Sequence, residues 1–569
     1  MKKLRIVAFL LVLCMFSTLL LACNSSDEGD DTTAATTQGT NATTNNNQNN
    51  NTDNNDDNNN SGNNNGGNNN GGNNNGGNNG GSTVDENEVP LYIYAVDEDY
   101  NGRPWDIDTI ELGQGSYMHI MKDTNLEEYN AFKKVLEDEG AYLYDTNQIG
   151  ENRYATYISK YQIINVMYLV YDYDENDTSL YPTATSKDHN EVRIIIDDRE
   201  YFDLPTREQD NVYSADPKVT PLLVMLSDNK VTWPGRMGYL YQLADGSFYI
   251  IDGGYWGAGN SFTANAMKPN ESSSVAHTIM QVLKAHAPDP ENIVIAGWLI
   301  THTHEDHLGA MVDISLREDY RSILTVETFI HNTPTDDELR AQNSANALIE
   351  IKDRLNEAIE RLSDSNTKII KAHAGQKIYL RDLMVEIYTS QSVLLYSDNV
   401  STGTPYTSIA HHNDTSILSR VYYQDTEAMY FGDTRQESNR LVINPVYRKY
   451  LDCDMLQVAH HGYGDTNSGW SYKHLTTPPK MVLWPDCRGH YDNKNPDGTD
   501  YYEGGKLYTG VKYVGFNKDA FFQADGSSKP GVTQVYLVDN TCAVITDFKN
   551  LNSYEMVDYV PANYNYYPN

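Results

Sequence analysis

Cysteine is scarce in this chain, which has five in 569 residues, at positions 14, 23, 453, 487 and 542. Only Cys453, Cys487 and Cys542 fall in the part with a globular composition, and no two of the five are spaced as Cys-x-x-Cys. The pattern indicates neither a thiolate zinc site nor a dense disulfide framework. The sequence does not decide whether two of these three residues form a disulfide.

Basic residues are also few. The 42 Lys and Arg residues stand against 79 Asp and Glu residues, which gives a formal net charge of −37. A surface this acidic repels polyanions. We therefore expect neither tight binding of duplex nucleic acid nor binding to an anionic membrane through a basic face. It leaves open an enzyme in which metal ions attract an anionic substrate locally.

Long apolar runs are limited to Ile6–Leu21, which follows Lys2, Lys3 and Arg5 and is short for the ~30 Å hydrocarbon core of a bilayer. Such a run behind basic residues is typical of an export signal. It ends in Leu20-Leu21-Ala22-Cys23, which resembles a bacterial lipobox. The resemblance implies that residues 1–22 are a lipoprotein signal peptide and that Cys23 carries a lipid; an uncleaved membrane anchor is the alternative. We therefore expect a protein anchored to the cell membrane and facing outside the cytoplasm.

Residues 23–87 contain few apolar side chains, and from 40 to 81 they are mostly Asn and Gly. Such a segment cannot bury enough apolar surface to offset the entropy lost on ordering. We predict that it is a disordered tether between the anchor and the rest of the chain.

Residues 88–215 are predicted to form a small α+β domain, and no motif in them indicates a role. The apolar spacing of Phe132, Val135 and Leu136 predicts a helix over 126–139. Strand-like patterns follow at 154–158, 163–171 and 191–196.

From residue 216 the pattern changes to alternating strands and helices, which indicates an α/β domain over 216–569. Helices are predicted over 274–285 and 335–362, the second because Thr335-x-x-Glu338 forms a capping box ahead of an apolar stripe. The apolar strand Ile293–Ile300 leads into His302-x-His304-x-Asp306-His307. At the end of a strand, this spacing can aim His302 and His304 at one metal ion and Asp306 and His307 at a second. These ligands suit zinc, with iron or manganese as alternatives.

Other motifs lie on both sides of this cluster. The sequence resembles the metallo-β-lactamase superfamily in His302–His307, in the turn Asp252-Gly253, in Phe431-Gly432-Asp433 and in His460-His461-Gly462. Asn413-x-x-Ser416 and the His-His-Gly motif resemble its competence-protein-like branch. The resemblance covers about residues 218–550 and implies an αββα sandwich with the metals at one sheet edge.

The resemblance also implies roles for individual residues. Asp433 would bridge two divalent ions, with His461 as the terminal ligand and His460 near the substrate. The sequence alone does not decide which of these two histidines is the ligand. Asp306 would serve both as ligand and in catalysis. The third histidine of the first metal site is predicted at His412, with His411 and His331 as alternatives.

The chemistry implied is hydrolysis by a hydroxide that bridges the two metals. The competence-like branch includes DNA-uptake nucleases and phosphorylcholine esterases, so our first expectation is a phosphodiesterase outside the cytoplasm. The acidic surface favours a small or wall-associated phosphodiester over long nucleic acid. The alternatives are a lactamase or lactonase that acts on a carbonyl substrate, and a surface binding lipoprotein with a vestigial metal site.

Overall fold

The computed structural model describes the chain from residue 89 onward, with gaps. The described residues are 89–94, 103–173, 188–205, 218–226, 237–254, 274–342, 345–397, 407, 409, 411–462, 469–487, 521, 528–537 and 541–560. The predicted signal peptide (1–22), the predicted tether (23–87) and the boundary between 215 and 216 lie outside the described residues. Within the described ranges, no helix is both long and apolar enough to cross a bilayer.

The predicted α+β segment contains a six-stranded antiparallel sheet with the order β1-β2-β6-β5-β4-β3. Its elements are β1 (Ile107–Gly113), β2 (Ser116–Lys122), α2 (Leu126–Asp138), β3 (Tyr142–Ile149), β4 (Asn152–Ile158), β5 (Gln162–Tyr171) and β6 (His189–Asp198). Helix α2 begins at a capping box formed by Asn125 and Glu128, and it packs Phe132 and Leu136 against one face of the sheet. The predicted helix and the three predicted strands are confirmed to within a few residues.

The remainder of the described chain contains two more sheets. The first has nine strands in the order β13-β12-β10-β9-β8-β7-β21-β22, with β11 beside β10. Its strands are β7 (Leu222–Met225), β8 (Gly238–Gln242), β9 (Phe248–Asp252), β10 (Ile293–Leu299), β11 (Leu324–Val326), β12 (Thr328–His331), β13 (Lys368–Lys371), β21 (Cys542–Ile545) and β22 (Glu555–Val557).

The second sheet has seven strands in the order of their numbers. They are β14 (Lys377–Leu380), β15 (Leu383–Thr389), β16 (Leu418–Tyr423), β17 (Thr426–Tyr430), β18 (Met455–Gln457), β19 (Met481–Cys487) and β20 (Thr533–Leu537). The remaining helical elements are α3 (Ser274–His286), α4 (Glu305–Leu316), α5 (Glu318–Arg321), α6 (Asp336–Arg340), α7 (Ala345–Leu362), α8 (Gln391–Leu394), η3 (His412–Thr415), α9 (Gln436–Ser438), η4 (Asn439–Tyr447), η5 (Arg448–Tyr450), η6 (Ala459–Gly462) and α10 (Gly469–Tyr472).

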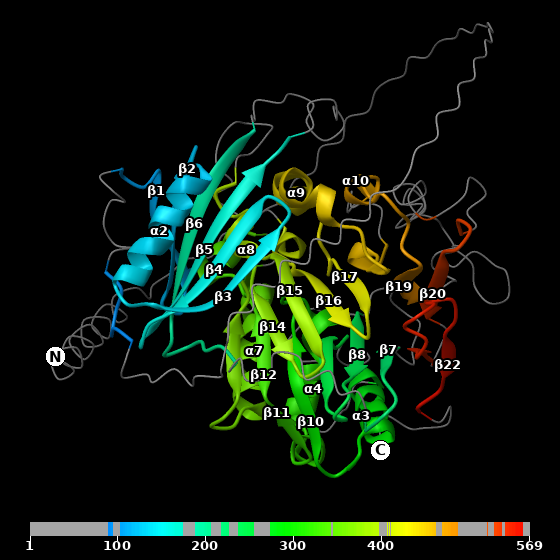
Figure 1. Ribbon diagram of the computed structural model, residues 1–569. Coiled ribbons are helices and arrows are strands. Elements are labelled where there is room, and N and C mark those ends of the chain that lie inside the picture. The colour runs from blue at the N-terminus through cyan, green and yellow to red at the C-terminus, as the bar shows by residue number, and fades with distance from the viewer. Residues whose placement is uncertain are drawn as a thin grey trace, which may run out of the picture. The chain divides into compact units, whose positions relative to one another are not determined.

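These two sheets form the inner layers of a sandwich (Figure 1). The core between them combines side chains such as Tyr239 and Leu299 of the nine-stranded sheet with Val385 and Val421 of the seven-stranded sheet. A second core holds α3, α4 and α7 against the outer face of the nine-stranded sheet. Helical segments including η4 cover the other side, where they share a third core with the seven-stranded sheet. The predicted α/β fold with an αββα sandwich is thus confirmed.

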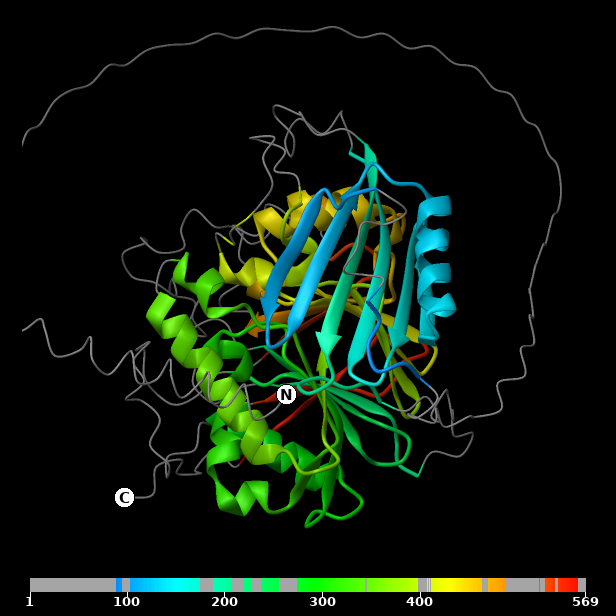
Figure 2. The ribbon, with the colours of Figure 1, turned by 90° about the vertical axis from the view of Figure 1, so that its left-hand side faces the viewer.

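The N-terminal sheet uses its two faces differently. One face carries α2, which Figure 2 shows running alongside the strands. The opposite face, with Met118, Met167 and Ile195, joins the third core together with Tyr388 and Tyr447. The N-terminal sheet therefore shares its apolar core with the sandwich.

Buried polar groups reinforce this junction. The guanidinium of Arg193, which is fully buried, lies 2.6 Å from Oε1 of Glu191 on its own strand. It also donates from Nη1 to the backbone carbonyls of Ser392 (2.8 Å) and Leu395 (2.6 Å) in the segment that follows β15. A buried charge requires such partners, so Arg193 links the N-terminal sheet to α8 through hydrogen bonds at fixed positions.

The single helix predicted over 335–362 is wrong. Thr335 does form the expected capping box with Glu338, but α6 ends at Arg340 and α7 begins at Ala345. Ala341, Gln342, Asn343 and Ser344 separate them in the sequence. Asn and Ser form helices less readily than Ala, Leu or Glu, which disfavours one continuous helix across this segment despite its apolar periodicity.

Candidate metal centre

The histidine cluster lies where β10 ends and α4 begins. Strand β10 pairs in parallel with β9 and β12, so the backbone after Leu299 leaves the sheet at its carboxyl edge. His304 is the N-cap residue of α4, and Asp306 and His307 lie in its first turn. The first turn of a helix favours a negative charge, so the fold accommodates the Asp306 carboxylate here.

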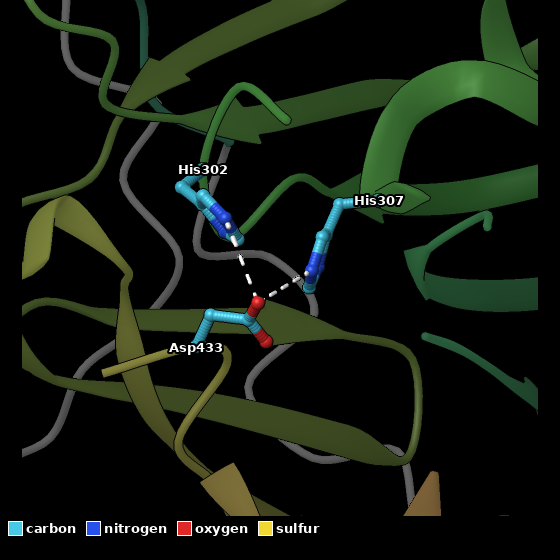
Figure 3. Close-up of side chains that lie close together, drawn as sticks. All are labelled: His302, His307 and Asp433. Carbon is cyan, nitrogen blue, oxygen red and sulfur yellow. Dashed lines mark ion pairs between the residues drawn. The ribbon is translucent and has the colours of Figure 1, made fainter. Parts of the chain in front are cut away.

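Two groups of side chains converge at this edge within metal-binding distance. The first is His302, His307 and Asp433, and the second is Asp306, His307 and His461; within each group the potential ligand atoms lie within 4.8 Å of one another. Oδ2 of Asp433 lies 3.2 Å from Nε2 of His307 and 4.0 Å from Nε2 of His302 (Figure 3). The same oxygen lies 3.5 Å from Nε2 of His461, which is itself 3.3 Å from Oδ2 of Asp306. Asp433 therefore stands between the two groups.

The other ring nitrogen of each histidine faces an acceptor. Nδ1 of His307 lies 2.8 Å from Oδ2 of Asp252, and Nδ1 of His461 lies 3.3 Å from the carbonyl of Pro485. The hydroxyl of Thr301 donates to Asp252, so its oxygen accepts from Nδ1 of His302 at 3.2 Å. These contacts place the proton on Nδ1 and leave the Nε2 lone pair for a ligand, as in metal sites with oriented histidines.

This arrangement fits divalent ions better than it fits the side chains alone. Lone pairs of His302, His307 and His461 point at carboxylate oxygens, an unfavourable contact that a shared cation or proton relieves. Burial lowers the pKa of His461, but the carboxylates of Asp433 and Asp306 outweigh it and raise the pKa to about 10. Within the described structure, Oδ1 of Asp433 is buried without a hydrogen-bond partner. Imidazole and carboxylate donors suit zinc, iron or manganese.

Asp433 is positioned by the turn that follows β17. The backbone amides of Phe431 and Gly432 donate to Oε1 of Gln457 at 2.7 and 2.8 Å, and the amide of Asp433 donates to Oγ of Ser416 at 3.0 Å. Gly432 has φ of +53°, and a Cβ there would lie 3.0 Å from Cβ of Ser416 and 3.1 Å from Cβ of Thr301. Glycine is therefore required directly before this carboxylate. Gln457 was not predicted as a support, although a polar residue at the end of the apolar strand Met455–Gln457 was a usable signal.

His460 and His461 occupy an unusual backbone conformation. Both lie in the left-handed region, with φ of +47° and +53°, which costs about 1–3 kcal/mol per residue and concentrates at functional sites. The amide of His460 donates to the carbonyl of Gly432 at 3.0 Å, which joins this segment to the turn that carries Asp433. Nε2 of His460 lies 3.0 Å from Nδ2 of Asn413 and 3.7 Å from Oδ2 of Asp433. His461 thus enters a ligand group, while His460 lies at its edge with an amide partner.

The remaining predicted histidines lie outside both ligand groups. Nδ1 of His304 is 3.1 Å from Nε2 of His302, which places it beside the first group. The ring of His412 is 4.9 Å from that of His304, but its Nε2 accepts from the amide of Thr303 at 3.2 Å. In this arrangement the Nε2 lone pair of His412 is occupied by the amide of Thr303. Burial lowers the pKa of both residues, to about 4 for His304.

The two alternatives to His412 have other neighbours. His411 is exposed, and its Nδ1 lies 3.0 Å from Nη1 of Arg435. His331 is buried at the end of β12, where its register partner is Lys371 on β13. Neither residue belongs to a ligand group found among the described residues.

One comparison with known proteins agrees with this fold. Residues 232–467 match the family model of the metallo-beta-lactamase superfamily, so the chain contains a domain of that superfamily. No curated protein matches the chain.

Several solved structures align with part of it. The metallo-beta-lactamase fold protein YhfI from Bacillus subtilis is 12% identical, with a TM-score of 0.29 over 56% of this chain and 97% of that one. CmlA, a diiron beta-hydroxylase from Streptomyces venezuelae, is 12% identical, with a TM-score of 0.26 over 56% of this chain and 53% of that one. Zinc-bound PqqB from Methylobacterium extorquens is 10% identical, with a TM-score of 0.23 over 46% of this chain and 71% of that one. Likenesses this distant carry no argument about function.

Proposed function

We propose that this chain is a metal-dependent hydrolase that cleaves phosphodiester bonds outside the cytoplasm. One observation carries the proposal: Oδ2 of Asp433 lies 3.2 Å from Nε2 of His307 and 3.5 Å from Nε2 of His461, where two groups of potential ligands overlap. Overlapping ligand groups with a carboxylate close to both are what a two-metal hydrolase requires.

The motif spacing and the ligand groups together indicate the residues that would hold the ions. From the spacing, His302 and His304 would bind one ion with Asp433; from the second ligand group, Asp306, His307 and His461 would bind the other with Asp433. His412 would be available to the first ion only if it gave up the amide of Thr303. Divalent ions at these positions would lower the pKa of a water molecule and stabilise negative charge on the substrate.

Two residues have the access that catalysis requires. The side chain of Asp306 is 26% exposed, whereas that of Asp433 is 2% exposed, so Asp306 is the carboxylate able to accept a hydrogen bond from an incoming water. His460 is 16% exposed, and Asn413 orients its ring. His460 is thus placed to contact the substrate.

Support for a phosphodiester comes from the Asn-x-x-Ser motif. Asn413 contacts His460, and Ser416 contacts both His302 and Asp433, so the motif that resembles the competence-protein-like branch acts directly on the candidate centre. The net charge of −37 disfavours long polyanions away from the centre and favours a small or wall-associated phosphodiester. We further propose that a lipid on Cys23 holds the enzyme at the outer face of the cell membrane.

The test compares three substrates on one preparation of the full-length protein loaded with zinc, iron or manganese. We expect turnover of bis(p-nitrophenyl) phosphate to exceed that of nitrocefin, a β-lactam, and of dihydrocoumarin, a lactone. Turnover of nitrocefin or dihydrocoumarin alone would replace the phosphodiester with a carbonyl substrate. Loss of all three activities in a protein that binds metal would favour the binding lipoprotein.

A further inference from the structure

A cleft lies on the N-terminal sheet, away from the candidate metal centre. It has a volume of about 280 Å³, and its lining includes Tyr92, Tyr117 and Tyr161. Tyr117 on β2 is the register partner of Ile196 on β6, and Ile196 belongs to the core that α2 covers. The cleft therefore opens on the face of the sheet that carries α2 (Figure 2), opposite the face that packs on the sandwich.

Three aromatic side chains are unusually exposed there. The exposed fractions are 45% for Tyr92, 41% for Tyr117 and 39% for Tyr161. The rings of Tyr92 and Tyr161 are 5.1 Å apart and inclined by 36°, which makes a continuous aromatic surface. A cluster of exposed rings with no internal packing role marks a binding surface.

Polar groups border these rings. Oε1 of Gln162 accepts from the amide of Ile93 at 2.7 Å, which fixes the side-chain amide at the cleft. Oδ1 of Asp198 accepts from the amide of Glu200 at 2.8 Å, which fixes that carboxylate in the lining. Each side chain has a second polar atom for a ligand: a donor nitrogen in Gln162 and an acceptor oxygen in Asp198.

Glycine keeps the cleft open at one point. Gly115 has φ of +71°, and a Cβ there would lie 2.8 Å from Cβ of Asp198 and 3.5 Å from the ring of Tyr201. Any side chain at this position would displace Asp198 from the lining. Glycine at position 115 therefore preserves the volume of the cleft. At about 280 Å³ that volume is close to the ~300 Å³ lower limit of small-ligand sites.

The charge pattern selects the class of ligand. No Lys or Arg is among the described residues that line the cleft, and the lining includes the carboxylate of Asp198, which disfavours an anion. A cation is disfavoured at Tyr161, because Nζ of Lys160 already lies 5.5 Å from the centroid of that ring. A neutral ligand with flat C–H faces and a rim of hydroxyls matches aromatic rings bordered by an amide and a carboxylate.

We propose that this tyrosine cleft binds a neutral carbohydrate chain, with sugar rings stacked on Tyr92 and Tyr161 and hydroxyls hydrogen-bonded to Gln162 and Asp198. The site is independent of the metal centre. It gives the N-terminal domain a role in holding the protein on a surface polysaccharide.

The experiment is calorimetric titration of the full-length protein in detergent with four probes: cellohexaose, chitohexaose, maltohexaose and xylohexaose. We expect at least one to bind saturably, and Tyr92→Ala and Tyr161→Ala each to weaken that binding by about 5- to 10-fold. Tyr161→Phe keeps the ring and should stay within about 3-fold of the unchanged protein. None of these variants should alter metal content or turnover of bis(p-nitrophenyl) phosphate.

Tyr142→Ala is the matched control, because Tyr142 is 37% exposed on β3 at the opposite edge of the same sheet. Equal loss of binding in Tyr142→Ala would assign the effect to general destabilisation and overturn the proposal. The absence of binding to all four sugars would also overturn the proposal. So would binding of choline chloride that is lost in Tyr161→Ala, since the cleft would then be a cation site.

Discussion

Nδ1 of His307 lies 2.8 Å from Oδ2 of Asp252, and both side chains are fully buried. The amide and hydroxyl of Thr301 also donate to this carboxylate, at 2.8 and 2.9 Å. A carboxylate accepts only, so the proton sits on Nδ1 and the Nε2 lone pair of His307 is aimed at Asp433. A residue outside both ligand groups thus sets the direction of the histidine that the two groups share.

Replacing Asp252 with Asn tests this role. Asn preserves the size of the side chain and tolerates the left-handed backbone at this position, where φ is +56°. We expect Asp252→Asn to weaken zinc binding by about 10- to 100-fold, because the imidazole loses its acceptor. Competition with a zinc-chelating dye measures the affinity.

Asp319→Asn is the control for this change, since Asp319 pairs with Arg317 at the surface and has an exposed side chain. Its zinc affinity should equal that of the unchanged protein. An affinity equally unaffected in Asp252→Asn would show that His307 is oriented by its packing alone.

The sequence predicted the fold class, and the residues it singled out at the centre lie close together in the structure. The candidate ligands in the His302–His307 segment were visible because four of them fall within six residues. Thr301 was not visible as a support, because its hydrogen bonds to Asp252 join residues 49 positions apart in the sequence. The same limit applies to His412, whose contact with Thr303 joins residues 109 positions apart.

Arg193 gives a prediction about stability. Arg193→Met removes the guanidinium and leaves the 1% exposed carboxylate of Glu191 without its charge partner. We expect the free energy of unfolding to fall by about 3–5 kcal/mol in urea titrations. Arg193→Met combined with Glu191→Gln should recover part of this loss, because no uncompensated charge remains.

Arg361→Met is the surface counterpart, since Arg361 pairs with Glu357 one helical turn away. That variant should lose less than about 1 kcal/mol. A double variant no more stable than Arg193→Met would place the whole effect in the bonds to Ser392 and Leu395.

His331 makes stability depend on pH. Burial lowers its pKa to about 4, with a smaller contribution from Lys371, whereas the unfolded residue titrates near ~6.5. Between these values the unfolded chain binds a proton that the folded chain does not, so stability falls as pH falls. From pH 7 to pH 5, the unchanged protein should lose about 2 kcal/mol more than His331→Phe.

Other histidines titrate in both proteins and cancel in this difference. Urea midpoints at pH 7, 6 and 5 give the two curves. Parallel curves would mean that His331 is charged in the folded protein or reaches water. The sequence could not decide this, because a histidine after an apolar strand reads equally as a ligand or as a core residue.

Substitution of Cys23 tests the proposed lipid anchor at the cell membrane. In a bacterial host fed an alkyne fatty acid, the unchanged protein should take up the label and begin at residue 23. Cys23→Ser should take up none, whereas Cys14→Ser should label normally because Cys14 lies in the predicted signal peptide. A protein that keeps residues 1–22 and carries no label would instead be held by an uncleaved anchor.

The most direct test of the central claim is the metal content of the purified full-length protein, measured by mass spectrometry beside its turnover of bis(p-nitrophenyl) phosphate, for the unchanged chain and for Asp433→Asn. The account predicts two divalent ions per chain, falling to one or fewer in Asp433→Asn, with turnover at least about 100-fold lower. A metal-free protein that turns over the substrate, or an Asp433→Asn variant with unchanged metal content and rate, would contradict it.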